Sequence, residues 1–328
     1  MRIKSMLTRR QVLHLAAGAA ALSLASRAAS ALDYPTRPVR IIVGYPAGGT
    51  ADIVSRIMAQ WLSERLGQQF IVENRPGAGG NLGTEAVVTA APDGYTLLMA
   101  DPSSTIGAAA YDKLNFNFIR DIAPVASIGR IPLVMQVNPS FPAKTVPEFI
   151  AYAQAHPGKI NMASGGIGTI THIGGELFMM KTGVKLQHVP YRGAQFIAGL
   201  ISGQVDVVFG ILTASLAQIK AGGLRALAVT TATRSLSLPD IPTVGEFVPG
   251  YEASSWGGIG APRNTPVAII EKLNKEINAG LAMPKLAARL SDLGNTIAPG
   301  SPADFGKFIA EDTEKWTQVV KAMGIKLT

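Results

Sequence analysis

The chain has 328 residues, of which 47% are hydrophobic and 16% charged, a balance that suits a globular protein of about two domains. It contains no cysteine, which excludes disulfides, thiol catalysis and zinc–thiolate sites. No apolar run reaches the roughly 18 residues that a membrane-spanning helix needs, so none is predicted.

The first 31 residues have the pattern of an export signal. The pair Arg9 and Arg10 precedes the apolar run at 12–25, and a small-x-small cleavage pattern ends at Ala31. We therefore expect a twin-arginine signal peptide at 1–31 and a soluble periplasmic protein after cleavage. Removing its five basic residues from the 30 in the chain leaves 25 against 22 acidic residues, so the net charge falls from +8 to +3. No basic cluster with interleaved aromatic residues remains, and no nucleic-acid partner is expected.

Strand and helix patterns alternate in the first half of the remaining chain. Short β-branched runs at 39–45, 68–75 and 95–100 predict strands, and 81–91 predicts a helix between the last two. A further helix follows the first strand, because apolar residues recur there with a period near 3.6: Ile53, Val54, Ile57, Met58, Trp61 and Leu62.

A second series of the same kind follows the segment 121–139. Thr145 and Glu148 form a capping box that opens a helix at 145–158. Strands are expected at 160–164, 186–191, 205–210 and 224–231, with helices near 171–182, 195–202 and 213–221. The proline- and glycine-rich stretch 239–262 is interpreted as a connection. Helices at 266–282 and 301–324 end the chain, the second with Ser301 as N-cap.

This order predicts an α/β fold of two domains, each a helix-covered, mostly parallel sheet. The final helices follow the second α/β unit, so the chain is expected to return to the first domain and to join the two by two crossings. We expect one domain to comprise 32–128 plus 256–328 and the other 129–255, with a cleft between them.

Each half contains a glycine-rich segment where a strand ends and a helix begins. The first has Asp52 in the opening turn of its helix, and the second has His172 one turn in. Backbone N–H groups at such a helix start, unshielded by side chains, form an anion site. The alternative is that the glycines only make tight turns. The two segments comprise Pro46, Ala47, Gly48, Gly49 and Thr50, and Ser164, Gly165, Gly166, Ile167, Gly168 and Thr169.

Other site templates do not fit. The stretches 77–83 and 166–171 lack the third glycine of the dinucleotide fingerprint, and no phosphate loop, G-x-S-x-G or H-E-x-x-H is present. His172 and Glu176 share a helix face, but no third ligand is apparent, so neither a metal nor another cofactor is expected. Asp206 interrupts an apolar strand and needs a hydrogen-bond partner, with tying down a loop as its simplest role. His188 is expected at a strand surface.

The motifs taken together resemble the Bug receptors, the periplasmic substrate-binding components of tripartite tricarboxylate transporters. The resemblance covers essentially the whole chain after the signal. It is carried, in order, by "YPAGG-x-x-D", "ENRPGAGGNLG", "PDGYTLL", "S-GG-x-GT-x-x-H", "VPYRG", "GQVDVVF" and "LPDIPTVGE".

The resemblance implies a two-domain Venus flytrap that closes on a small carboxylate, either a di- or tricarboxylate or an aromatic one. It implies that 46–50 and 164–169 grip the carboxylate through backbone and ordered water, and that Ser103, Ser104 and Tyr191 line the cleft. Two positions depart from the family pattern: Tyr45, where phenylalanine is common, and Gly210, where an acid is common. The missing acid weakens the case for an amino-acid ligand.

The expected partners are the carboxylate and the membrane subunits of a transporter, and the protein is expected to be a monomer without enzymatic activity. A ligand sensor for a signalling system is an alternative within the same class. A periplasmic hydrolase or lyase is the alternative from another class, and it would need His172 and Asp206 to meet as base and orienting partner.

Overall fold

The computed structural model describes residues 33–111 and 113–324. The expected export signal at 1–31 lies outside this part of the chain and stays a prediction. Among the described helices, none combines the length and the apolar character that crossing a bilayer requires.

The first part of the chain builds a parallel sheet from β1 (Val39–Val43), β2 (Phe70–Asn74) and β3 (Thr96–Ala100), as predicted. β1 lies between the other two, because Ile41 pairs with Val72 on one side and Leu97 on the other. Helices α2 (Thr50–Leu66) and α3 (Asn81–Val88) pack against these strands, and α3 follows the short turn η1 (Ala78–Gly80). Two helices that the sequence did not indicate follow β3: α4 (Pro102–Ala110) and α5 (Phe118–Asp121).

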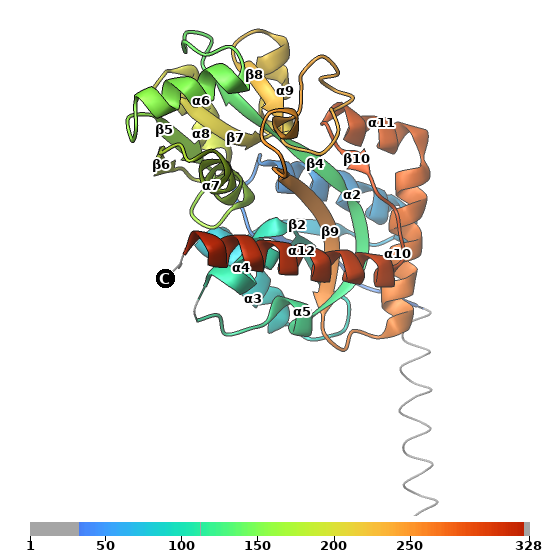
Figure 1. Cartoon of the computed structure of the whole chain (residues 1–328). Coiled ribbons are helices and arrows are strands. Elements are labelled where there is room, and N and C mark those ends of the chain that lie inside the picture. The colour runs from blue at the N-terminus through green and yellow to red at the C-terminus, as the bar shows by residue number, and fades with distance from the viewer. Residues whose placement is uncertain (1–32, 112, 325–328) are drawn as a thin grey trace, which may run out of the picture.

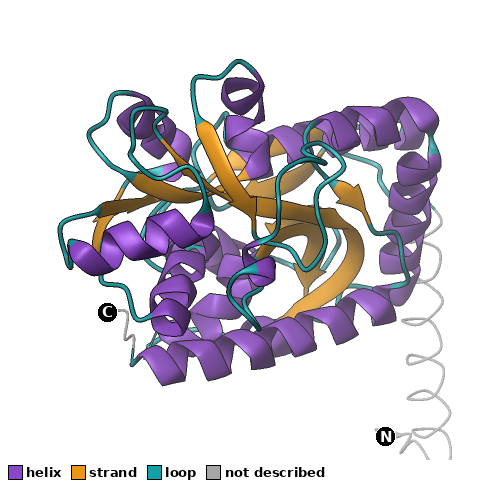
Figure 2. Ribbon diagram, turned by 45° about the horizontal axis from the view of Figure 1, so that its top comes forward, coloured by secondary structure: helices purple, strands orange, loops and turns teal. Residues whose placement is uncertain are grey.

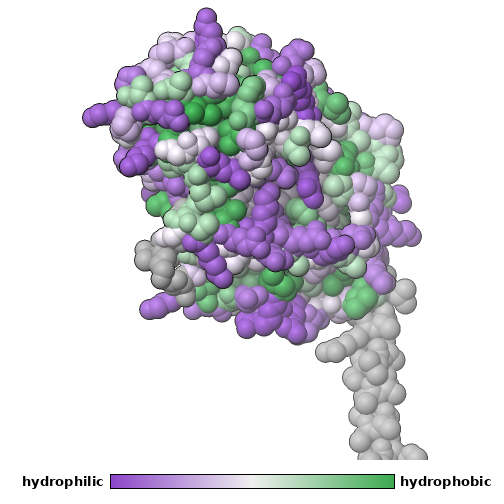
Figure 3. Space-filling model, in the orientation of Figure 1, coloured by the Kyte–Doolittle hydropathy of each residue, from purple (hydrophilic) through white to green (hydrophobic). Residues whose placement is uncertain are grey.

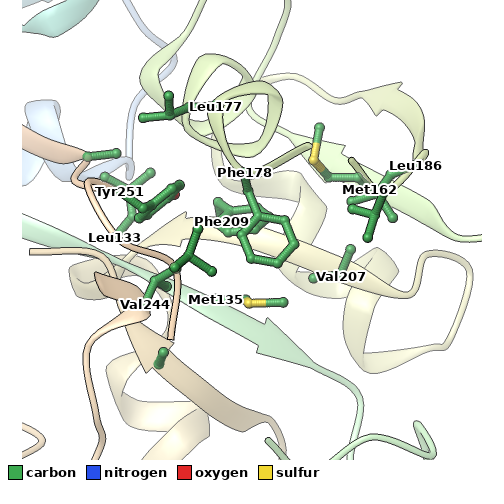
Figure 4. Close-up of a cluster of buried hydrophobic side chains, with 14 of the residues drawn as sticks. Leu133, Met135, Met162, Leu177, Phe178, Leu186, Val207, Phe209, Val244 and Tyr251 are labelled. Atoms are coloured by element: carbon green, nitrogen blue, oxygen red, sulfur yellow. The ribbon is translucent and has the colours of Figure 1, made fainter. Parts of the chain in front are cut away.

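The second α/β unit has β5 parallel to both β6 and β7. Its core gathers aromatic and sulfur-containing side chains, with Phe178 and Phe209 side by side and Met162 nearby (Figure 4). The elements are α6 (Val146–Ala155), β5 (Asn161–Ser164), α7 (Ile170–Thr182), β6 (Gln187–Pro190), η2 (Gly193–Gln195), α8 (Phe196–Ile201), β7 (Val207–Ile211), α9 (Leu212–Lys220), β8 (Arg225–Val229) and η3 (Val244–Glu246).

Two long antiparallel strands, β4 (Ile122–Val137) and β9 (Ser254–Pro262), join the halves (Figure 1). Across the molecule the strand order is β2-β1-β3-β9-β4-β7-β5-β6, with β8 and β10 also paired to β4. The sheet is thus parallel in its outer parts and antiparallel at its centre, and helices enclose its strands (Figure 2).

β9 corrects one prediction, since the connection expected at 239–262 is a buried strand over its last nine residues. Its glycines gave no strand pattern in the sequence, but they are needed because other groups pack directly against the β9 backbone. A Cβ at Gly258 would run into the ring of Phe305 and lie 2.8 Å from the Ala126 carbonyl oxygen. A Cβ at Gly257 would lie 2.7 Å from Cε of Met99.

The chain ends with α10 (Val267–Ala282), α11 (Pro284–Asp292), β10 (Thr296–Ile297) and α12 (Pro302–Met323). The expected N-cap of α12 is confirmed, because Ser301 accepts the N–H of Asp304. Hydrophilic side chains gather along the band of surface where α12 lies (Figure 3).

The inner face of α12 contributes to both halves. Phe305 and Ile309 join the cluster around Leu98 of β3, whereas Trp316 and Val320 join the cluster around Phe178. Between them the partly buried Asp312 side chain accepts three hydrogen bonds, from Thr105 Oγ1 at 2.7 Å, Trp256 Nε1 at 3.0 Å and Trp316 Nε1 at 3.1 Å.

Candidate functional site

A cavity of about 360 Å³ lies where the glycine-rich segments of the two halves face each other. The loop between β1 and α2 and the end of β3 contribute from the first half, and the loop between β5 and α7 and the η2 turn from the second. Several apolar side chains also line it: Val54, Met99, Ile131, Phe196, Ile211 and Trp256. Its volume is within the range of small-molecule sites.

The start of α2 presents free backbone donors to this cavity. Gly49, Thr50 and Ala51 line it, and none of their N–H groups has a partner within the described residues. Gly48, with φ of 84°, instead gives its N–H to the Asp52 carboxylate at 2.9 Å. This arrangement leaves three donors at the positive end of a helix dipole, which is the chemistry of an anion site.

Asp52 does not line the cavity but holds the loop from below. Its carboxylate also accepts from Arg56 and from Asn74, whose Nδ2 donates to the Tyr45 carbonyl as well. Burial alone would raise the pKa of Asp52, but the hydrogen bonds from Arg56, Gly48 and Asn74 hold it below its usual value. We infer that Asp52 stays ionised and fixes the loop that leads into α2.

At the start of α7 the free N–H groups are not those of the glycines, as the sequence had suggested, but lie further along the chain. The N–H groups of Gly165, Gly166 and Gly168 are all occupied, by Thr171 Oγ1 at 2.9 Å, Ser164 Oγ at 3.1 Å and His172 Nδ1 at 3.2 Å. The expectation that Gly168 offers its own N–H is therefore wrong for this structure. The N–H groups of Ile167, Ile170 and Thr171 have no partner in the described chain, and of these residues Ile170 and Thr171 line the cavity.

Two stacked histidines support this second loop. The rings of His172 and His188 lie 3.9 Å apart, and His188 Nε2 is 2.7 Å from Ser164 Oγ. Because His172 Nδ1 accepts the Gly168 N–H, its proton is on Nε2, which faces Glu176 at 3.4 Å. Burial, and then the neighbouring His172, lower the pKa of His188 to about 4. His188 is half-buried rather than a surface residue, and sequence periodicity gave no sign of this pairing.

Tyr45 and Ser103 form a polar section of the wall. Tyr45 Oη donates to Ser103 Oγ at 2.6 Å, and the N–H of Ser103 donates to Asp101 at 2.8 Å. Burial raises the pKa of Asp101 to about 6. Asp101 was not predicted as a site residue, although its place before Pro102 is a helix N-cap signal.

Several other expected site residues lie behind the wall. Tyr191 packs against Gly199, Asp206 accepts the N–H of Asn161 at 2.7 Å, and the N–H of Ser104 is bonded to the Asp101 carbonyl. Of the expected residues, the cavity lining includes Tyr45, Pro46, Ala47, Gly48, Gly49, Ser103, Gly165 and Thr169; it does not include Asp52, Ser104, Ser164, Gly168, His172, Tyr191 or Asp206.

The loops of the two halves adjoin at the cavity. A Cβ at Gly193 of η2 would lie 3.6 Å from Pro46 Cδ, and one at Gly79 would lie 3.2 Å from the Ile167 carbonyl oxygen. Arg192, beside this contact, is the one basic side chain among the described lining residues, and it is exposed. Within the described chain, His172 and Glu176 gain no further His, Cys, Asp or Glu that would complete a metal site.

Two α/β units joined by β4 and β9, with a ligand-sized cavity between their loops, are the arrangement of a two-lobed solute-binding protein. The sequence comparison gives the family: residues 54–325 match the model described as tripartite tricarboxylate transporter family receptor, and the chain belongs to that family. Protein BugT of Bordetella pertussis is 35% identical over 302 residues, covering 91% of this chain and 93% of that protein.

Solved structures agree with this assignment. Rpa4515 of R. palustris, solved with adipate, is 35% identical with a TM-score of 0.86, covering 89% of this chain and 99% of that one. MatC of Rhodopseudomonas palustris, solved with bound malate, is 30% identical with a TM-score of 0.83, covering 88% of this chain and 100% of that one. The expected family and fold class are therefore confirmed.

Proposed function

We propose that this protein is a periplasmic receptor that captures a small carboxylate in its cavity and delivers it to the membrane subunits of a tripartite tricarboxylate transporter. The observation that carries the proposal is the pair of helix starts, α2 and α7, which present five unpartnered N–H groups to one cavity: those of Gly49, Thr50, Ala51, Ile170 and Thr171. Relatives solved with adipate and malate support a carboxylate as the ligand.

The carboxylate is held mainly by backbone. Its oxygens accept from the two helix starts, while Tyr45 and Ser103 supply side-chain hydroxyls at the same end. Asp52, Ser164 and His172 act from behind, because they accept the N–H groups of glycines in the two loops. His188 supports them through its hydrogen bond with Ser164. The ligand body lies against the apolar wall formed by residues such as Ile131 and Trp256.

The two units act as the jaws of a flytrap, with 32–128 plus 256–328 as one domain and 129–255 as the other. The contact of Pro46 with Gly193 is then made on closure. The hydrolase alternative is not favoured, because both ring nitrogens of His172 are engaged and Asp206 is bonded to Asn161 behind the wall.

The proposal is tested by screening di-, tri- and aromatic carboxylates for an increase in melting temperature, followed by calorimetric titration. A ligand at a hundredfold excess over Kd adds about 2.7 kcal/mol to the unfolding free energy. We expect the binding ligand also to reduce the radius of gyration and to be recovered unchanged. Binding without compaction would contradict the flytrap, and turnover would contradict the receptor function.

Export by the twin-arginine route is part of the proposal. Changing Arg9 and Arg10 together to lysine should leave an unprocessed precursor in the cytoplasm. Normal processing of this double variant, measured by cell fractionation, would exclude that route.

A further inference from the structure

Ser255 of β9 is a cavity-lining residue whose hydroxyl has no hydrogen-bond partner within the described residues. It is 5% exposed, and its Oγ, unlike the unpartnered Oγ atoms of Ser55 and Ser215, is not completely enclosed by protein. Since Ser255 lines the cavity, the accessible Oγ opens onto it. A native protein rarely leaves a buried hydroxyl unpaired without a reason.

The sheet fixes the direction of this side chain. Ser255 pairs with Ile131 of β4, and residues directly opposite each other in an antiparallel pair point to the same face. Gly257, two residues further along β9, is on that face too, and a Cβ there would lie 2.7 Å from Met99 Cε. Ile131 and Met99 both line the cavity, so Ser255 places a hydroxyl within the apolar floor that they form.

Other hydroxyls of the lining already have protein partners. Thr169 Oγ1 and Thr171 Oγ1 lie 2.8 Å apart. Tyr45 Oη donates to Ser103 Oγ at 2.6 Å. Ser255 has no such neighbour within the described chain, so its hydroxyl is free for a molecule in the cavity.

The surroundings of Ser255 favour a neutral partner. Arg130 lies next to Ile131 in β4, but its guanidinium is placed over the ring of Phe308, 4.4 Å from the ring centre, and neither of these two residues lines the cavity. A second carboxylate set against Ile131 and Met99 would therefore be costly to desolvate. A ligand hydroxyl fits better, because it and Ser255 can each donate or accept, so the bond forms with either as the donor.

We propose that Ser255 is a specificity-determining residue that hydrogen-bonds a hydroxyl on the carbon body of the ligand. The carboxylate of the same ligand is bound by the two helix starts, so this inference rests on the proposed function. The ligand class is then a hydroxycarboxylate.

Pairs of compounds that differ by one hydroxyl test this: butyrate against β-hydroxybutyrate, succinate against malate, and benzoate against para-hydroxybenzoate. Calorimetric titration of the native protein should show at least one hydroxylated compound binding about threefold to tenfold more tightly than its parent. In Ser255→Ala this preference should disappear, because the hydroxylated compound weakens while its parent does not. Ser255→Cys, whose thiol is a weak donor, serves in its place if the alanine variant does not fold.

Ser215→Ala is the matched control. Ser215 of α9 also has an unpartnered Oγ, but that atom is completely enclosed, and Ser215 does not line the cavity. This variant should keep the preference for the hydroxylated compound. A preference that disappears in both variants would point to a general packing effect and overturn the inference.

Two further results would also decide the matter. If carboxylates bind but no hydroxylated compound exceeds its parent, or if the preference survives Ser255→Ala, the inference is wrong while the proposed function stands. If no carboxylate in this set or in the wider screen binds the native protein, the proposed function is itself wrong and the inference falls with it.

Discussion

Replacing Thr50 by proline should remove one donor from the carboxylate site without breaking the helix that carries it. Thr50 is the first residue of α2, and its N–H has no partner in the described chain. Proline is accepted at the first helical position because no intrahelical bond is lost there. The preceding Gly49, with φ of −79° and ψ of 169°, already has the extended conformation that a residue before proline prefers.

The expected cost in affinity is that of one hydrogen bond to a charged group. Such a bond contributes about 1.5–3 kcal/mol, so Kd should rise roughly 10- to 150-fold. The unfolding free energy should change by less than about 0.5 kcal/mol, since the substitution leaves the core and the caps of α2 intact. Thr50→Ala is the matched control, because it keeps the N–H and removes only the side chain.

Calorimetric titration with the tightest carboxylate from the screen, together with thermal melts, measures both quantities. Thr50→Ala should bind nearly as the native protein does. A folded Thr50→Pro variant with native affinity would refute the assignment of the α2 start as the anion site. Loss of binding in both variants would transfer the role from the backbone N–H to the threonine side chain.

Three further predictions concern stability. Folding lowers the pKa of His188 from 6.5 to about 4, so between these pH values the unfolded chain binds more protons than the folded one. The unfolding free energy should therefore fall on acidification through this window, by up to about 1.4 kcal/mol per pH unit. Chemical denaturation at several pH values should show less of this loss in His188→Gln. Gly258→Ala should lose about 1–3 kcal/mol in thermal melts, because its Cβ runs into Phe305, and a native melting temperature would show that β9 can shift. Asp312→Ala should lose about 3 kcal/mol or more in urea unfolding, because three buried donors lose their acceptor; a smaller loss would mean that water replaces the carboxylate.

The sequence predicted the parts of the fold that depend on local pattern. Local sequence was enough to predict the parallel strands such as β1, the amphipathic helix α2 and the N-cap Ser301. β9 could not be predicted in this way. Its glycines leave room for the side chains of Phe305 and Met99, which lie far away in the sequence.

The candidate site, too, could be predicted from the sequence only in part. The glycine-rich helix starts were visible in the sequence, but which N–H groups remain free depends on side chains that return to the loop. His172 takes the N–H of Gly168, and Asp52 takes that of Gly48. No sequence pattern indicated that Asn295 lines the cavity, because it lies more than a hundred residues from the loops that begin α2 and α7.

The packing of α12 has a consequence for biosynthesis. Because Phe305 belongs to one hydrophobic cluster and Trp316 to another, neither cluster is complete until the last helix has been translated and has left the ribosome. The chain therefore gains its final stability only after synthesis ends. A message truncated before residue 302 would yield a product with both cores open, and proteases would degrade it rather than leave half a receptor.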